Sequence, residues 1–276
     1  MAVITGLISC KQGSQKKVES PPSYDFSKPM KFWMPGKLDE ISGISINYDF
    51  VYAVQDELGK LYRFQLDSDK IKSTKFGYKA DYEDLAILDS NVFILESNGT
   101  IYSFPLALSD SDDVNVTQKW TLPASQCEYE GSFADSRSHK LYILSKECKD
   151  DRITQKRTGI IAVWKNDSLV VIDSFAIDLA LLRKLDGNKK SKFNPSALAL
   201  HPITLQWYIL SASNKMLIIT DEKWTPILTI KLKNSMFTQP EGICFDSAGN
   251  LYIANEKGDA FEGRILKFEN LWIKKE

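Results

Sequence analysis

Histidine is scarce in this sequence: the 276 residues include only His139 and His201, too few for a histidine-rich metal site or a His-based triad. The four cysteines form no CxxC pair, so a structural zinc site is not expected. No charge of one sign dominates, because 35 Lys and Arg oppose 36 Asp and Glu, and nucleic acid is therefore not an expected partner. No run of about 18 apolar residues is present, so no membrane-spanning segment is expected.

Hydrophobic and aromatic residues, by contrast, are plentiful enough for a buried core, at 43% and 11% of the chain. Five segments repeat one pattern of short β-branched and aromatic runs separated by turn residues. The segments begin at Ser42, Glu83, Glu130, Pro195 and Glu241, which gives spacings in the forties apart from one of 65 residues. Three short strands per unit at this period predict an all-β, five-bladed β-propeller.

The ends of the chain predict how the ring closes. The last unit stops after its third strand, and Lys31-Phe-Trp-Met34 precedes the first unit. We expect this N-terminal strand to supply the missing outer strand of the last blade, because closure removes two exposed sheet edges. Similar outer strands are read at Lys119-Trp-Thr-Leu122 and Ile227-Leu-Thr-Ile-Lys-Leu232. Residues 21–276 would form the single propeller domain.

The long spacing between the third and fourth units holds two insertions. Residues 147–158 are expected to form a charged loop. Residues 177–185 have helical periodicity, with Asp178 early, Arg183 late and Gly187 as a stop signal. They predict one short amphipathic helix packed on the propeller between blades three and four.

Acidic residues recur where each innermost strand begins and where the turn between the second and third strands lies, two places that open on one face of a propeller. Carboxylates that converge on a narrow channel repel one another unless protons or a cation neutralise them. Calcium suits such a site, because it takes about six to eight oxygen ligands in irregular geometry. The alternative is that each acid binds backbone amides of the neighbouring blade. The predicted calcium ligands are Glu83, Glu130 and Glu241, completed or supported by Glu40, Asp81, Glu96 or Glu256.

Both histidines fall in turns between first and second strands, at the mouth opposite these acids. We therefore expect His139 and His201 to stabilise turns or to lie exposed rather than to catalyse a reaction. No Gly-x-Ser-x-Gly, P-loop or dinucleotide-binding motif is present in the sequence.

The N-terminus resembles the lipobox of bacterial lipoproteins. Leu7-Ile8-Ser9-Cys10 follows a short apolar run and precedes a polar stretch up to Ser20. Lipidation of Cys10 would anchor the protein to a membrane through residues 1–20 without spanning it. The alternative is an ordinary tail with a chance cysteine. Export would also permit a disulfide, for which Cys127 and Cys148 are the plausible pair, although the odd number of remaining cysteines argues against a disulfide-built scaffold.

Several motifs, in order along residues 30–270, resemble the SdiA-regulated family of YjiK-like proteins, which are distantly similar to NHL-repeat propellers. The motifs are Glu40-Ile-Ser-Gly-Ile44, Asp81-Tyr-Glu83, Glu130-Gly131, Pro195-Ser196, Gln239-Pro-Glu-Gly-Ile243 and Leu251-Tyr-Ile-Ala-Asn-Glu256. The resemblance implies a five-bladed propeller with a calcium site. Pro195 and Ser213 break the acidic pattern in blade four, which indicates a cation placed off the axis.

Together these features predict a monomeric, calcium-binding propeller, lipid-anchored in the bacterial cell envelope, in the periplasm or at the outer membrane. It would bind an unidentified ligand or protein on its acidic face without catalysis. The alternative is a metal-dependent hydrolase of the lactonase or phytase type, in which the cation polarises a carbonyl or phosphoryl oxygen.

Overall fold

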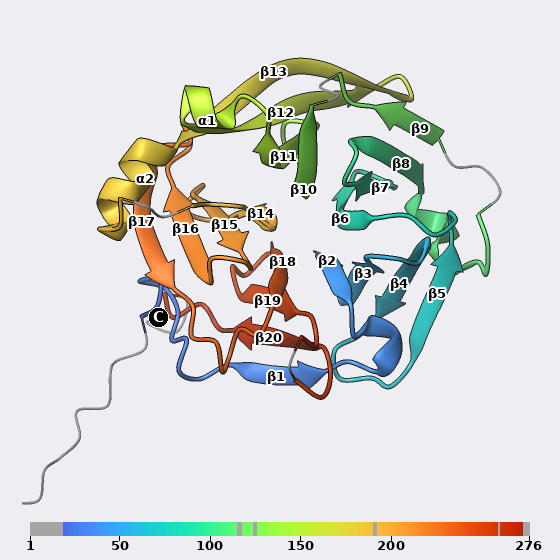
Figure 1. The fold of residues 1–276 in the computed structure, drawn as a ribbon. Coiled ribbons are helices and arrows are strands. Elements are labelled where there is room, and N and C mark those ends of the chain that lie inside the picture. The colour runs from blue at the N-terminus through green and yellow to red at the C-terminus, as the bar shows by residue number, and fades with distance from the viewer. Residues whose placement is uncertain (1–18, 115–117, 124–125, 190–191, 259, 273–276) are drawn as a thin grey trace, which may run out of the picture.

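The protein is a five-bladed β-propeller in a computed structural model that describes residues 19–114, 118–123, 126–189, 192–258 and 260–272 (Figure 1). Cys10 lies outside these residues. Within them, the strands form five four-stranded antiparallel sheets that are arranged around a central axis. Their innermost strands are β2 (Ile41–Asn47), β6 (Tyr82–Leu88), β10 (Cys127–Asp135), β14 (Ala197–Leu200) and β18 (Pro240–Phe245).

Each of the first four blades continues outward in chain order, as β-hairpins require. Blade one adds β3 (Phe50–Gln55), β4 (Lys60–Phe64) and β5 (Ile71–Lys75), and blade two adds β7 (Asn91–Glu96), β8 (Thr100–Pro105) and β9 (Gln118–Thr121). Blade three adds β11 (Lys140–Cys148), β12 (Lys156–Lys165) and β13 (Ser168–Asp178), and blade four adds β15 (Trp207–Ser211), β16 (Met216–Thr220) and β17 (Pro226–Lys231).

Blade five confirms the predicted closure. It contains β18, β19 (Leu251–Asn255) and β20 (Arg264–Phe268), and its outer strand is the N-terminal β1 (Met30–Trp33). Phe32 lies opposite Ile265 in this pairing, and β1 and β20 lie side by side in Figure 1. Phe26, just before β1, is fully buried and its ring lies 4.5 Å from that of Phe268. The two ends of the chain therefore share one hydrophobic core.

The core lies mainly between adjacent blades, where apolar faces of neighbouring sheets meet. One cluster joins blades five and one and includes Ile44, Tyr62 and Tyr252, while another joins blades three and four and includes Trp207 and Trp224. The inner strands approach closely at glycines. A Cβ atom added to Gly43 would lie 2.4 Å from Asp84 Oδ1 of the next blade, so only glycine fits there.

The insertion between blades three and four is partly as predicted. The helix α2 (Leu179–Asp186) is present on the outside of the propeller, begins two residues later than expected, and is capped by Asp178, whose carboxylate accepts from the amides of Ala180 and Leu181. Residues 147–158, predicted to be a charged loop, instead include the end of β11, the helix α1 (Asp151–Thr154) and the start of β12. Short 3-10 helices η1 (Gly36–Leu38) and η2 (Leu106–Asp110) complete the described elements. No helix among the described residues is long and apolar enough to cross a membrane.

Candidate functional site: an acidic chamber at one mouth of the channel

A cavity of about 170 Å³ lies where the innermost strands begin, and we call it the acidic chamber. Its lining is almost entirely polar and includes one lysine among six carboxyl groups. The lining residues are Ser42, Asp56, Asp81, Glu83, Glu130, Lys146, Ser196, Gln239, Glu241 and Glu256. The structure thus brings together five of the seven predicted ligands, namely Asp81, Glu83, Glu130, Glu241 and Glu256.

In four of the five blades, a β-bulge positions the inner-strand residue that lines the chamber. In β6 the partners pass from Tyr82–Glu96 directly to Asp84–Leu95, so Glu83 has no partner across the ladder. The same shift leaves Ser42, Glu130 and Glu241 unpaired in β2, β10 and β18. A bulge bends its strand and redirects the extra side chain. The repeated bulge therefore turns these residues toward one chamber.

Glu40 joins the site from its edge. Ligand atoms of Glu40, Asp56 and Glu256 all lie within 4.8 Å of one another, close enough to share a cation. Glu256 is 7% exposed, and Asp56 Oδ1 is buried without a hydrogen-bond partner. A buried carboxylate oxygen without a partner is costly, and a cation would satisfy it. We call these three residues the off-axis triad, because they come only from blades one and five.

Glu96, a predicted ligand, is not among the residues that line the chamber. Glu96 accepts from the hydroxyl of Tyr102 at 2.7 Å and from the side-chain amide Nδ2 of Asn98 at 2.6 Å. Asp56 directly follows Gln55, the residue of β3 that pairs just before the bulge of the inner strand. The equivalent residue is Ser97 in blade two and Lys146 in blade three. Glu96 therefore stands one residue before the position that faces the chamber, and a shift of one residue exchanges the two faces of a strand.

Lys146 lines the chamber but, like Asp56, was not among the predicted ligands. Its ammonium lies 2.5 Å from Glu130 Oε1 and 3.1 Å from Glu128 Oε1. Burial alone would lower the pKa of Lys146, but the hydrogen bonds and charges of Glu130 and Glu128 outweigh it and raise that pKa. The chamber therefore contains a permanent cation of its own. Lys215 of blade four lies outside the lining of the chamber, and burial lowers its pKa against the opposing charges of Glu241 and Glu256.

Five of the six carboxyl groups of the chamber have raised pKa values. Burial, followed by the charges of Glu130 and Asp81, raises the pKa of Glu83 to about 10. Burial, followed by the charges of Glu241 and Glu40, raises the pKa of Glu256 to about 9. Burial raises the pKa of Glu130 to about 7 against the opposing effect of Lys146, and it also raises the pKa values of Glu241 and Asp56. At neutral pH the chamber therefore holds protons unless another cation replaces them.

Asp84, the residue after Glu83 in β6, joins two blades. Its carboxylate is fully buried, accepts from the amides of Leu85 and Ser132 at 2.8 and 2.7 Å, and so ties blade two to blade three. Beyond it lies the opposite mouth, where both histidines are found as predicted. His139 is exposed beside Asp89, and the Nδ1 atom of buried His201 accepts from the amides of Ile203 and Thr204 within its own turn.

The carboxyl groups of the chamber are the kind of ligand that hard cations take, whereas its two serine hydroxyls are already engaged. The hydroxyls of Ser42 and Ser196 donate to the backbone carbonyls of Tyr82 and Pro240, so both serve the contacts between blades. A volume of 170 Å³ holds an ion and a few waters but is below the range of about 300 to 1,000 Å³ typical of small-molecule pockets.

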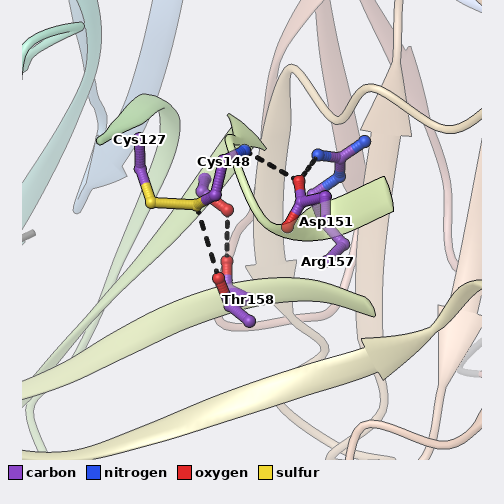
Figure 2. Close-up of a disulfide and its surroundings, with 6 residues drawn as sticks. Cys127, Cys148, Asp151, Arg157 and Thr158 are labelled. Atoms are coloured by element: carbon purple, nitrogen blue, oxygen red, sulfur yellow. Dashed lines mark hydrogen bonds and ion pairs between the residues drawn. A yellow bond between two sulfur atoms is a disulfide. The ribbon is translucent and has the colours of Figure 1, made fainter. Parts of the chain in front are cut away.

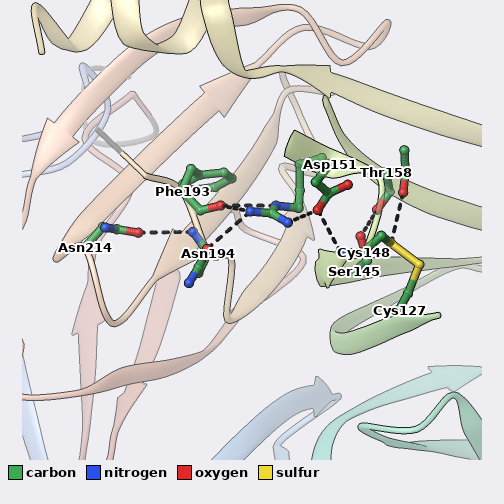
Figure 3. A network of polar contacts seen from close by, with 9 residues as sticks. Cys127, Ser145, Cys148, Asp151, Thr158, Phe193, Asn194 and Asn214 are labelled. Atoms are coloured by element: carbon green, nitrogen blue, oxygen red, sulfur yellow. Dashed lines mark hydrogen bonds and ion pairs between the residues drawn. A yellow bond between two sulfur atoms is a disulfide. The ribbon is translucent and has the colours of Figure 1, made fainter. Parts of the chain in front are cut away.

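The structure also shows which cysteines are paired. Cys127 and Cys148 form a disulfide between the chamber-side ends of β10 and β11, as Figure 2 shows, and Cys244 is a buried free thiol. Cys148 belongs to a larger polar network (Figure 3). Its amide donates to Asp151, and the buried Asp151 pairs with the buried Arg157.

Comparison with known proteins agrees with the fold. The SdiA-regulated family model matches residues 21–261. Among solved structures, the luciferin-regenerating enzyme has a TM-score of 0.56 at 9% identity, with 88% of this chain and 96% of that chain covered. Glutaminyl cyclase from Myxococcus xanthus also has a TM-score of 0.56, at 11% identity, with 87% and 94% covered. A chain of the nidogen/laminin complex has a TM-score of 0.51 at 12% identity, with 85% and 77% covered. At these identities the likeness shows the propeller fold alone.

Proposed function

The chain belongs to the SdiA-regulated family, and from that premise we propose that it is a calcium-binding propeller of the cell envelope. It binds a ligand or partner protein on its acidic face and does not catalyse a reaction. The observation that carries the proposal is the off-axis triad, where three carboxylates converge and Asp56 Oδ1 is buried without a partner.

Calcium is the cation that suits this donor set. The triad offers only carboxylate oxygens, the ligands that hard cations prefer, and neither histidine lies at this mouth. Calcium accepts irregular arrangements, whereas magnesium demands a compact octahedron and retains several waters. The expected ligands are Glu40, Asp56 and Glu256, with Glu83 and Glu241 supporting the site through their charge.

The envelope location is supported by the disulfide. Disulfides persist in oxidising compartments such as the bacterial periplasm and are rare in the cytosol. Cys127 and Cys148 are joined in the structure, which agrees with export and with lipidation at Cys10. The propeller would then be a monomer that is tethered to a membrane through its N-terminal segment.

The proposal is tested by calcium titration of the purified protein after chelation, with magnesium titrated in parallel. We expect one site that prefers calcium, and Asp56→Asn should weaken it. The matched control is Glu57→Gln, because Glu57 is adjacent in sequence but is exposed and paired with Lys79. Equal loss of binding in both variants would indicate a general charge effect rather than a site. Retention of full binding in Asp56→Asn would remove the off-axis triad from the account.

The hydrolase alternative makes a different prediction for the same samples. The small volume of the chamber and the use of both serine hydroxyls in blade contacts favour binding over catalysis. A calcium-loaded protein that hydrolyses lactones or phosphate esters, and loses that activity with Glu256→Gln, would establish the alternative.

A further inference from the structure

A second cavity, of about 470 Å³, lies at the mouth opposite the acidic chamber, and we call it the distal cavity. It is lined by the far ends of all five innermost strands and the turns that follow them, within residues 44–47, 85–89, 132–137, 198–202 and 243–247. Its volume falls inside the range of about 300 to 1,000 Å³ typical of small-molecule pockets, whereas that of the chamber does not. The distal cavity is therefore large enough for a small organic ligand.

Blade three leaves its share of the cavity wall open. Residues two apart in a strand share a face, and the wall includes the second and fourth residues after the chamber residue near the start of each innermost strand. In four blades these residues are isoleucine, leucine or phenylalanine, such as Ile44 and Ile46 in blade one. In blade three they are Ser132 and Ala134. These two small side chains form a recess in a wall that is otherwise bulky and apolar.

Ser132 gives the recess a polar group. The residue is 6% exposed and its amide donates to Asp84 Oδ2 at 2.7 Å, but its hydroxyl has no hydrogen-bond partner within the described part of the chain. A buried hydroxyl without a partner costs free energy. This hydroxyl can donate and accept, and rotation about χ1 can turn it toward a ligand in the recess. A hydroxyl group on the ligand would therefore satisfy it.

Two aromatic rings add to the wall of the distal cavity. Phe133 of blade three and Phe245 of blade five both line it and are only partly buried. Each already packs edge to face on a neighbour, Phe133 on Trp207 with ring centroids 5.4 Å apart and Phe245 on Tyr208 with centroids 5.1 Å apart. Their remaining exposed surface favours an aromatic ring in the ligand, because aromatic pairs gain from such geometry beyond the area they bury.

The rim of the distal cavity is acidic. Asp89, Asp135 and Asp246 line it together with one basic residue, Arg137. Arg137 Nε lies 3.0 Å from Asp135 Oδ1 and compensates that carboxylate. Asp89 contacts the exposed His139, and Asp246 accepts from uncharged groups of its own blade. Among the described residues, neither of these two carboxylates has a lysine or arginine within ion-pair distance, so the rim favours a cationic group in the ligand.

We propose that the distal cavity binds a small aromatic amine that carries a hydroxyl at the end opposite its amino group. The ring lies against the apolar wall, the hydroxyl meets Ser132 in the recess, and the ammonium lies at the rim near Asp89 and Asp246. Ser132 is three residues from Asp135 of the rim along β10, a distance of about 10 Å, so the two polar ends of the ligand are separated by the length of a ring and a short chain. This site is separate from the acidic chamber and needs no calcium.

The first test compares three probes on the wild type in chelator. Tyramine has both polar ends, phenethylamine lacks the hydroxyl, and 4-(2-hydroxyethyl)phenol has a neutral hydroxyl in place of the ammonium. Calorimetric titration gives the Kd of each. We expect tyramine to bind about tenfold more tightly than either analogue, a factor that corresponds to about 1.4 kcal/mol. Equal affinities for the three probes, or no binding of tyramine at millimolar concentration, would overturn the proposal.

The second test changes the protein at each end of the ligand. In Ser132→Ala the preference for tyramine over phenethylamine should disappear, and in Asp89→Asn the preference for tyramine over the neutral phenol should shrink. Each preference is a ratio measured within one protein, so a general change in affinity cancels. The control Asp69→Asn alters an exposed acid outside the lining and should keep both ratios. Wild-type ratios in Ser132→Ala and Asp89→Asn would contradict the proposed orientation.

The third test fills the recess. Ala134→Leu gives blade three the kind of side chain that the other blades have, and tyramine affinity should fall about tenfold or more. Ala134→Ser keeps the recess open and should bind as the wild type. Melting temperatures show whether both variants fold, and if Ala134→Leu does not, the ratios of the second test decide. Unchanged affinity in a folded Ala134→Leu protein, or weaker binding of tyramine to Glu256→Gln, would place the amine outside the distal cavity and refute the proposal.

Discussion

Lys146 and Glu130 are the two bulged residues of the β10–β11 ladder, and their charged groups meet at 2.5 Å. Each strand has one residue without a cross-strand partner, and the two side chains point into the same chamber. Bulges redirect side chains in this way near functional sites. The ion pair shows that the propeller partly neutralises its own cluster of acids, which lowers the cost of bringing six carboxyl groups together.

The stability of the calcium-free protein should fall as the pH rises. Glu83 and Glu256 have pKa values of about 10 and about 9 in the folded state, above the ordinary carboxyl value of 4.5. At pH values between 4.5 and these raised pKa values, the folded state binds more protons than the unfolded state. The free energy of unfolding therefore decreases as the pH increases through this range. Urea unfolding in chelator at pH 5, 7 and 9 should give decreasing free energies of unfolding.

Calcium should flatten that profile, because it neutralises the carboxylates without protons. Glu83→Gln should flatten it as well, even in chelator. A calcium-free wild type that is equally stable at pH 5 and pH 9 would show that the chamber acids do not repel one another in the folded state.

The contact between blades one and two should not tolerate a side chain at Gly43. An added Cβ would lie 2.4 Å from Asp84 Oδ1 and 2.7 Å from Asp84 Cα. Because the neighbour is partly backbone, we expect Gly43→Ala to destabilise the protein by about 1–3 kcal/mol, the usual cost of overpacking. The control is Gly36→Ala, whose nearest neighbour would be at an ordinary 3.8 Å. Equal melting temperatures of the two variants would contradict the close approach.

Closure of the ring can be tested at Phe26, which precedes β1. Its side chain is fully buried against Phe237 and Phe268. Phe26→Ala should lower the free energy of unfolding by about 3–5 kcal/mol, because it leaves a cavity between the chain ends. Phe261→Ala is the matched control, since Phe261 is 95% exposed. Deletion of residues 1–38 should likewise abolish cooperative unfolding, whereas deletion of residues 1–20 should not.

The buried pair of Asp151 and Arg157 should contribute strongly to the stability of the folded protein, although neither residue lines the chamber. Removing one member leaves the other as an uncompensated buried charge, at a typical cost of about 3–5 kcal/mol. We therefore expect Asp151→Ala to destabilise the protein strongly, and chemical denaturation provides the measurement. Glu57→Ala, which breaks an exposed pair with Lys79, should cost less than about 1 kcal/mol.

The blades and their closure could be predicted from sequence because each unit repeats the same local pattern. Two outer strands, β5 and β13, were not anticipated. Lys72 and Lys75 of β5 are exposed, and β5 lacks the apolar run that reveals a strand. The strand β13 does contain such a run at residues 169–172, but it was not read as a strand.

The sequence predicted the chamber acids of the inner strands, but of the chamber residues near the ends of the second strands it predicted only Glu256. Glu83, Glu130 and Glu241 were found because each stands next to the recurring start of an inner strand. Glu96 was misplaced and Lys146 was missed, because the register of the second strand depends on bulges formed with the first. Such a register is set by pairing between strands and leaves no local signal in the sequence.

The central claim is that the acidic chamber holds calcium, and thermal melting with calcium and with chelator tests it most directly. A ligand at a hundredfold excess over its Kd stabilises the folded state by about 2.7 kcal/mol. For a protein of this size, the wild type should therefore melt about 5 °C or more higher in calcium than in chelator. Magnesium should have a smaller effect, and Glu256→Gln should show little response. If the wild type and Glu256→Gln melt at the same temperature with calcium and with chelator, the chamber is not a calcium site and its acids serve only to join the blades.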